Sequence, residues 1–458
     1  MIADWVKSET DGCEMADKRL TDRLGKILTQ LGSTPERSIP NANDSWADVQ
    51  ATYRFLNNPR VSFNDIISGH RTATLKRMSG ARVVLIPQDT TFFNFARQGH
   101  REGFGTLVIP ESDQHLLHVS AAFTPDRVNL GVVEATLWQR PEKDAGYQRR
   151  KVPIQDKESM RWLDHYKRAC DIQAAHPDTL VVSIADREGD IHEWFGLADD
   201  TALERQAAYI VRAKCNRRLE YDDDEHSTLW EYFQHTKRLG QYTVDVPPRG
   251  AQPARTARMN VSAKVVTFVG RSRASKTPVE LQVVYAKELQ PPHGVKGIEW
   301  MLLTNLHVDD FDGARAIIEW YRCRWEIEVF FRVLKGGCQV EKLRLQNTER
   351  LENCLAVYLI IAWRLHCITM LARSMPELPC DKVFSRREWH TILLMKDKKK
   401  PPKHPPTLYE VTRKLAMLGG FLGRKGDGEP GVKNIWIGFQ RLLDYIEAIE
   451  MFNSVSSS

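Results

Sequence analysis

Several features are missing from this sequence of 458 residues, and each absence excludes a class of protein. Its eight cysteines form no CxxC pair and no spacing typical of a zinc site, so the simplest interpretation is reduced thiols in a cytosolic protein. The first residues, MIADWVKSETDG, contain no apolar core of signal-peptide length. The longest apolar run, 355–363, is far short of a membrane span. We therefore expect a cytoplasmic protein without a membrane partner.

The composition is that of a globular protein with a slight basic surplus. Hydrophobic residues make up 42% of the chain and charged residues 27%, which is ordinary for such proteins. Lysine and arginine number 65 against 59 acidic residues, a net charge of +6, so a polyanionic partner is favoured only weakly. The length predicts two to four domains.

The two ends of the chain are predicted to be helical. Residues 1–75 include an amphipathic pattern at 18–31 with basic side chains away from its apolar stripe. Short helices with exposed arginines suit DNA docking, although a packing domain with solvated charges would have the same pattern. Residues 376–458 contain helix patterns at 408–422 and 435–451, whose apolar faces suit either self-association or packing within the chain.

Between these regions, 76–375 has the strand and helix patterns of an α/β fold. Short apolar strands predicted at 82–87 and 179–184 lead to Asp89 and Asp186 respectively. Folds of this class place reactive side chains at such strand ends. Either aspartate alone is more simply a helix N-cap or a turn residue, but two at equivalent positions favour a shared site.

A β-rich segment interrupts this core. A strand pattern at 209–214 contains the basic residues Arg212 and Lys214, and another strand is predicted at 298–304. Between them, at about 216–297, alternating β patterns are separated by polar loops. We interpret this segment as a β-rich insertion into the core rather than a separate domain after it.

Four polar side chains recur along 320–337, WYRCRWEIEVFFRVLKGG, which we predict to be helical. At about 100° per residue, Tyr321, Arg324, Glu328 and Lys335 fall within a sector roughly 60° wide. The rest of the circumference is largely apolar, so this stripe is expected to face a cleft, a ligand or a partner. The alternative is a solvated face on which Arg324 and Glu328 form an i, i+4 ion pair.

Asp89, Asp186 and Glu328 together would supply hard oxygen ligands suited to Mg²⁺ or Mn²⁺. Two such ions support displacement at a phosphodiester. Arginine binds phosphate bidentately and lysine acts as a point charge, so the cations beside Glu328 fit a negatively charged, extended substrate. Glycosidases also use paired carboxylates, but that chemistry does not call for a cationic stripe.

These residues carry a resemblance to a known family. The pattern Y-x2-R-x3-E-x6-K in 320–337 matches in full the Y-R-E-K motif of a group of bacterial insertion-sequence transposases. Asp89 in IPQDTT and Asp186 in ADREGDIHEW match the first two acidic residues of the catalytic triad of that family. The stretches TYRFLNNPRVS, IVRAK, WMLLT and LGGF extend the resemblance, in order, over nearly the whole chain.

The resemblance implies a fold and a site. The fold would be an RNase H-like catalytic core, 76–375, which carries the β-rich insertion and is flanked by a DNA end-binding domain, 1–75, and a dimerisation region, 376–458. Two Mg²⁺ ions, with Mn²⁺ as a substitute, would be the only cofactors. The implied catalytic metal ligands are Asp89, Asp186 and Glu328, and the implied DNA contacts are Trp300, Arg212, Lys214, Tyr321, Arg324 and Lys335.

The activity that the resemblance implies is cut-and-paste DNA transposition. Water nicks the element end, the released 3′-OH attacks the opposite strand to form a hairpin, and the reopened end is joined to target DNA. Trp300 would stack on an extruded base, with a core tryptophan as the alternative. The implied partners are double-stranded DNA, on the bacterial nucleoid, and a second copy of the chain in a synaptic complex. A nuclease without strand transfer and a DNA-binding regulator without catalysis stay open as alternatives.

Overall fold

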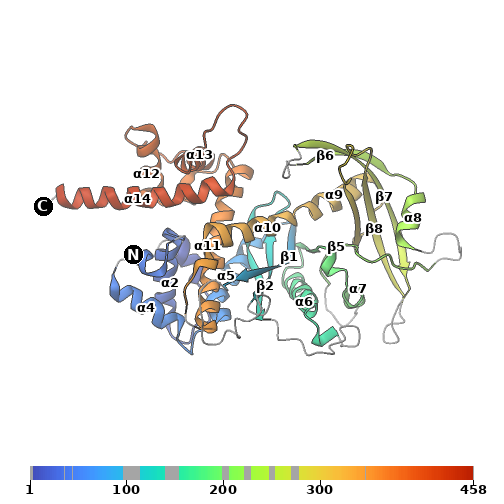
Figure 1. Ribbon diagram of the computed structural model, residues 1–458, viewed down its shortest axis with the longest axis horizontal. Helices are drawn as coiled ribbons and strands as arrows, with labels where there is room; N and C mark the ends of the chain where they lie inside the picture. The colour runs from blue at the N-terminus through green and yellow to red at the C-terminus, as the bar shows by residue number, and fades with distance from the viewer. Residues whose placement is uncertain are drawn as a thin grey trace. The chain divides into compact units, whose positions relative to one another are not determined.

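The computed structural model describes residues 4–456 except 36, 44, 96–113, 140–153, 199–205, 221–227, 247–252, 270–277 and 346 (Figure 1). The chain divides into two compact units. The first unit comprises Met1–Ser79, Thr90–Lys143 and Glu326–Ser458, and the second comprises Gly80–Asp89 and Asp144–Trp325. The domain boundaries predicted after residues 75 and 375 are not limits of these units and stay predictions.

The second unit is built on a sheet with the strand order β1-β4-β5-β9-β8-β7-β6. β1, β4 and β5 pair in parallel, and the other strands pair antiparallel. The parallel strands are buried along most of their length, as expected for strands covered on both faces. The elements are β1 (Val83–Asn94), α6 (Met160–Ala175), β4 (Leu180–Ala185), α7 (His192–Ala198), β5 (Ala208–Arg212), α8 (Leu229–His235), β6 (Gly240–Val246), β7 (Arg255–Phe268), β8 (Val279–Glu288), β9 (Glu299–Thr304) and α9 (Phe311–Arg322).

The predicted insertion is β-rich in its described part. β6, β7 and β8 pair consecutively and join the core sheet at β9, because β8 pairs with β9 over Gln282–Lys287 and Glu299–Thr304. The insertion therefore continues the core sheet instead of forming a sheet of its own. This arrangement confirms the α/β class predicted from the alternation of strand and helix patterns.

The first unit is organised around α11 (Thr348–Ser374), which contacts α2, α4, α5, α13, α14 and β3. Among the described residues, α11 is the one helix whose length and apolar composition would allow it to cross a membrane. However, 89% of its most apolar window is buried inside the protein. A helix that is apolar around its circumference and buried in this way is typical of a protein core. The other elements are α1 (Asp4–Thr10), α2 (Lys18–Ser33), α3 (Ile39–Ala42), α4 (Trp46–Leu56), α5 (Phe63–Met78), β2 (Gln114–Phe123), β3 (Asn129–Gln139), α10 (Trp325–Arg332), α12 (Arg386–Asp397), α13 (Leu408–Leu418) and α14 (Val432–Ser456).

Two glycines allow the C-terminal helices α13 and α14 to pack closely (Figure 1). A Cβ added to Gly419 would lie 1.9 Å from the carbonyl oxygen of Asn434, and one added to Gly438 would lie 2.1 Å from that of Leu415. No other residue fits without moving a backbone. The sequence LGGF therefore has a packing role at the end of α13.

A buried polar network joins α1, α5 and β3 in the first unit. The backbone N–H of Val132 donates to Nε2 of His70 at 3.0 Å, so Nδ1 carries the proton that is donated to Glu9 at 2.5 Å. Arg77 also donates to Glu9, at 2.6 Å, and to the carbonyl oxygen of Leu130. Burial lowers the pKa of His70. Burial opposes the ionisation of Glu9, but His70 and Arg77 outweigh it and hold the pKa of Glu9 below its ordinary value.

This network predicts a loss of stability in acid. Both groups have lowered pKa values in the folded protein, so the unfolded chain binds more protons and stability falls as the pH drops below about 6.5. In His70→Gln the histidine contribution, up to about 1.4 kcal/mol per pH unit, should disappear. The test is to measure the thermal unfolding temperature of both proteins between about pH 8 and pH 5, the range in which histidine titrates. The exposed His235→Gln is the control, and an unchanged pH slope in His70→Gln would contradict the assignment.

Candidate active site

Asp89 lies on β1, two residues after Pro87, which forms the last parallel pair with Ile184 of β4. β1 itself continues to residue 94, so the predicted end of this strand at residue 87 is wrong. The parallel pairing with β4 ends at Pro87, but the strand itself continues. The side chain of Gln88 donates to Ser183 at 3.0 Å and joins the two strands at this point. Asp89 keeps 21% of its side chain exposed.

Asp186 directly follows β4 and occupies the equivalent position, two residues after Ile184. One of its carboxylate oxygens accepts a hydrogen bond from the backbone N–H of Glu188 at 2.7 Å and caps a 3-10 turn, Arg187–Gly189. The N-cap role that we weighed as an alternative is therefore present. It engages one oxygen, so a role as a metal ligand is compatible with it. The structure brings Asp89 and Asp186 to the same end of two neighbouring strands.

Asp190, four residues further on, is a structural residue that sequence reasoning missed. Its side chain is fully buried and pairs with Arg217. Its Oδ2 accepts hydrogen bonds from the backbone N–H groups of Lys214 at 2.6 Å and Cys215 at 2.8 Å. The turn that delivers it is tight, because a Cβ on Gly189 would lie 2.5 Å from that of Ala185. The available sequence signal for this role was the position of Asp190 directly after Gly189 in the stretch DREGD.

The prediction of one regular helix through 320–337 is wrong. α9 ends at Arg322, α10 begins at Trp325, and a π-helical stretch occupies Val333–Gly337. At the break the N–H groups of Cys323 and Arg324 donate to the third carbonyl before them instead of the fourth, which tightens the turn and ends the α-helical pattern. Tyr321, Arg324, Glu328 and Lys335 therefore do not share the face of a single α-helix.

The break directs Arg324 toward the first aspartate. Its guanidinium lies 3.3 Å from the carboxylate of Asp89 and is 11% exposed. It also lies 5.7 Å from the ring of Trp325, a side chain that is 51% exposed. The predicted cation and the first predicted carboxylate thus lie together.

Trp300 and Tyr321 form an aromatic pair in the second unit. Trp300 lies on β9 opposite Ala286 of β8. Its ring centroid is 6.1 Å from that of Tyr321, with the two rings at 62°. Tyr321 is buried, whereas Trp300 is only partly buried. The alternative of a core tryptophan therefore does not describe Trp300.

The two predicted basic residues near β5 have different environments. Arg212, the last residue of β5, donates to the carbonyl oxygen of Glu299 at 2.9 Å and is partly buried. Lys214 is exposed, and Asp190 holds its backbone. An exposed ammonium group on an anchored backbone suits a phosphate contact.

The remaining predicted site residues belong to the first unit. Glu328 lies on α10 and is partly buried. Lys335 donates to the carbonyl oxygen of Phe92 at 2.5 Å and lies 4.6 Å from the centre of that ring. Burial lowers the pKa of Lys335, and Glu341 opposes the shift. Among the residues that the structure describes, no three His, Cys, Asp or Glu side chains gather closely enough to hold a metal ion, so the three-carboxylate site stays a prediction.

A second acidic residue of α10, Glu326, has a packing role that the sequence pattern did not reveal. It is buried and lies 3.3 Å from Nε2 of His366 on α11. Nδ1 of the same imidazole lies 3.1 Å from the amide nitrogen of Asn129 on β3. Arg127 lies 3.8 Å from Glu326. These contacts fix α10 within the first unit and leave Glu328, two residues later, on a different side of the helix.

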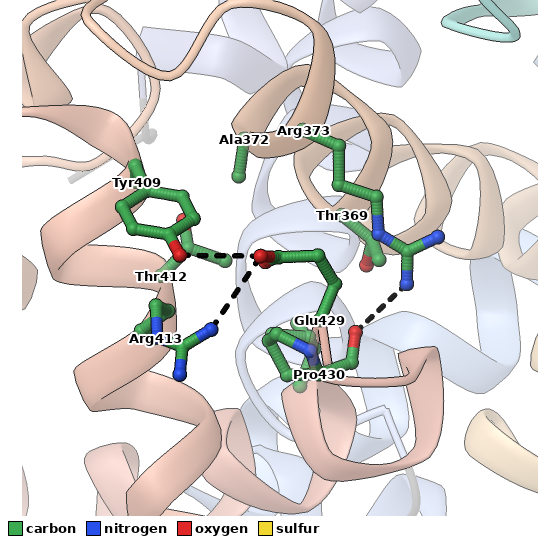
Figure 2. Close-up of a pocket in the computed structure, with 9 residues that line it drawn as sticks. Thr369, Ala372, Arg373, Tyr409, Thr412, Arg413, Glu429 and Pro430 are labelled. Carbon is green, nitrogen blue, oxygen red and sulfur yellow. Dashed lines mark hydrogen bonds and ion pairs between the residues drawn. The ribbon is translucent and has the colours of Figure 1, made fainter. Parts of the chain in front are cut away.

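Two cavities of the first unit lie away from these residues. One has room for about one water molecule, 10 Å³, and Figure 2 shows Glu429 accepting from Tyr409 at 3.1 Å and pairing with Arg413 beside it. The other, 580 Å³, is lined partly by Glu134, Glu349 and Glu352. Burial, reinforced by Glu349, raises the pKa of Glu352. The first cavity is too small for a polyanion and contains an ion pair of its own. The second is unsuited to a polyanion because carboxylates form part of its lining.

Comparison with known proteins identifies three families along the chain. Residues 2–61 match transposase DNA-binding domains, 182–364 match transposase DDE domains and 360–458 match the transposase Tn5 dimerisation domain. A solved structure, the piggyBac transposase synaptic complex with hairpin DNA, is 8% identical over 98% of this chain and 78% of that chain, with a TM-score of 0.33. The family matches confirm the predicted fold class, an RNase H-like DDE core with an N-terminal DNA-binding domain and a C-terminal helical dimerisation domain.

Proposed function

This chain belongs to the Tn5-like DDE transposases, and we propose that it moves a DNA element by cutting and pasting. In this proposal two copies pair the two element ends, cleave them through a hairpin and join the 3′-OH ends to target DNA. The observation that carries the proposal is the placement of Asp89 and Asp186 at the same end of neighbouring strands, with Arg324 on Asp89. Two acidic ligands beside a fixed cation suit metal-assisted chemistry on a phosphodiester.

Asp89 and Asp186, with Glu328 as the third ligand, would hold two Mg²⁺ ions. Their donor set consists of hard carboxylate oxygens, which Mg²⁺ and Mn²⁺ prefer. When bound, two such ions activate the attacking oxygen and stabilise the leaving oxygen. Arg324 pairs with Asp89 and so presents its guanidinium where a phosphate would approach. The ammonium group of Lys335 would contact the phosphate backbone of the DNA as a point charge.

Three displacements at phosphorus account for the proposed DNA cleavage. Water attacks the phosphodiester at the element end, and the 3′ oxygen leaves and takes up a proton. That 3′-OH then attacks the opposite strand and forms the hairpin as it displaces flanking DNA, and a second water reopens the hairpin. A tight hairpin forces a base out of its stack. Trp300, partly exposed and braced by Tyr321 at 6.1 Å, would receive it.

The test is excision and integration with purified protein. A plasmid carries a marker between the DNA segments that flank this gene, and the protein is incubated with it and Mg²⁺. We expect excision at defined ends and joined products in new DNA, neither of which should form with Glu328→Gln. Glu377→Gln, which removes the same charge from an exposed position of the first unit, should behave as the wild type.

Each other outcome separates the proposal from one alternative. Cleaved ends without joined products would favour a nuclease that lacks strand transfer. Binding of ends without cleavage, including a pre-nicked end, would favour a regulator. Cleavage by Glu328→Gln would contradict the third ligand while leaving the family assignment unchanged.

Arg324 should compete with the metal for Asp89. The guanidinium lies 3.3 Å from the carboxylate, so Arg324→Gln should lower the Mg²⁺ concentration for half-maximal cleavage by up to about tenfold, the value of roughly 1.4 kcal/mol. The maximal rate should fall as well, because a phosphate contact is lost. Arg324→Lys keeps the charge and should lie between the two. Titration of cleavage with Mg²⁺ measures this, and a raised metal requirement in Arg324→Gln would contradict it.

A further inference from the structure

The end of α12 and the segment that joins it to α13 carry a dense group of positive charges that the proposed site does not use. Residues 396–406, KDKKKPPKHPP, are called the lysine loop below. Its five lysines are all exposed: Lys396, Lys398, Lys399, Lys400 and Lys403. This loop lies within the part of the chain that matches the dimerisation domain, so the match with the DNA-binding domain does not account for it.

The lysine loop contains one carboxylate, Asp397, against its five lysines. Asp397 pairs with Lys414 of α13 at 2.5 Å. Lys414 in turn lies 2.8 Å from Glu410, one turn before it on the same helix. Lys414 is thus shared between Asp397 and Glu410, which draws the carboxylate of Asp397 toward α13. With five lysines and one aspartate, the loop therefore keeps a net charge of 5 − 1 = +4 with histidine neutral.

The backbone of the lysine loop is held at both ends. Lys398 has a left-handed conformation, φ +53°, and its N–H donates to the carbonyl oxygen of Leu394 at 3.1 Å, which closes α12. At the other end, the carbonyl oxygen of Pro406 accepts from the N–H of Cys380 at 2.9 Å. The prolines at 401, 402, 405 and 406 restrict φ between these points. Little backbone entropy remains to be lost when a partner binds.

We propose that the lysine loop binds the phosphate backbone of duplex DNA without reading its sequence, which would place it on DNA outside the recognised ends. The choice of DNA as the polyanion rests on the proposed function. The loop contains no arginine, asparagine or glutamine, the side chains that read base edges bidentately. Lysine provides point charges instead. A second copy of the same loop would be repelled by like charge, which excludes self-association through this surface.

The test is the salt dependence of binding to a duplex of unrelated sequence. In the variant Lys399→Gln/Lys400→Gln/Lys403→Gln, the slope of log affinity against log salt should become shallower by about 0.9 per lysine, about 2.7 in all. Between about 50 and 200 mM salt the variant should then lose about fortyfold less affinity than the wild type. The matched control, Lys382→Gln/Lys425→Gln/Lys433→Gln, removes three exposed lysines from the same region outside the loop and should keep the wild-type slope.

An unchanged slope in the loop variant would overturn the proposal. An equal change of slope in the control would also overturn it, because it would indicate a general effect of net charge. Loss of binding to anionic phosphatidylserine vesicles with unchanged DNA binding would also overturn it, in favour of a membrane surface. Charge reversal, Lys399→Glu/Lys400→Glu/Lys403→Glu, should weaken DNA binding further. If the wild type cuts no DNA but the slope still becomes shallower in the loop variant, the proposed function is wrong, whereas the proposal that the lysine loop binds DNA still holds.

Discussion

Asp89→Asn is expected to abolish strand cleavage while DNA-end binding persists. Asparagine keeps the shape of the side chain and loses the charge that would hold a divalent ion. The contribution of such an ion is several kcal/mol, so the cleavage rate should fall by roughly 10³-fold or more. Single-turnover cleavage of a labelled element end in Mg²⁺ measures the rate, and a mobility shift measures binding. Binding should be equal or tighter, because one negative charge beside the DNA has been removed.

Asp309→Asn is the matched control, since it removes the same charge from a side chain of the second unit that is 79% exposed. It should cleave at the wild-type rate. Asp186→Asn should fail as Asp89→Asn does, and the double variant should be little worse than either, because groups that act as one unit are not additive. A rate for Asp89→Asn within tenfold of the wild type would show that Asp89 is no metal ligand.

The part of the site that could be predicted from sequence is the part that short-range patterns determine. Two apolar runs, each followed by an aspartate, predict two buried strands with acids at one end. The observed register places Asp89 and Asp186 equally far beyond the last pair of the two strands. The α/β class followed from the same periodicity. The spacing of the Y-R-E-K motif indicated the family, and the match of residues 182–364 with transposase DDE domains confirms it.

The contacts between distant segments could not be predicted in the same way. Helical periodicity gives no sign of the break at Cys323, because Trp320 through Gly337 contains neither proline nor a glycine before its end. Helical periodicity also gives no sign that the guanidinium of Arg324 contacts Asp89, 235 positions earlier. Partners so far apart in sequence are set by tertiary packing, which overrides local propensity.

The same limit applies to the buried acids. Asp190 and Glu326 stand beside the predicted ligands in sequence, and composition alone does not separate an acid that faces solvent from one that is buried. The structure separates them, since Asp190 pairs with Arg217 and Glu326 with His366. Buried charges are retained where partners satisfy them, and those partners lie on other elements.

Asp190→Ala should destabilise the second unit and weaken DNA binding together. The mutation leaves the guanidinium of Arg217 buried without its counter-charge, between the rings of Phe195 and Phe268, each 5.2 Å away. Breaking one side of a buried ion pair costs about 3–5 kcal/mol. The apparent free energy of unfolding in urea should fall by that amount. The backbone of Lys214, which Asp190 holds at 2.6 Å, would also be released, so affinity for DNA should decrease even under conditions in which the protein remains folded.

Two variants decide whether the ion pair is the cause. Glu188→Ala removes an acid of the same turn that is 60% exposed and lies 3.6 Å from Arg161, and an exposed pair should cost less than about 1 kcal/mol. Asp190→Leu/Arg217→Met replaces the pair by apolar side chains and should recover most of the stability. It should not recover DNA affinity, because leucine accepts no hydrogen bond from the N–H groups of Lys214 and Cys215. Recovery of both would mean that Asp190 serves the fold alone, and that Lys214 keeps its position without it.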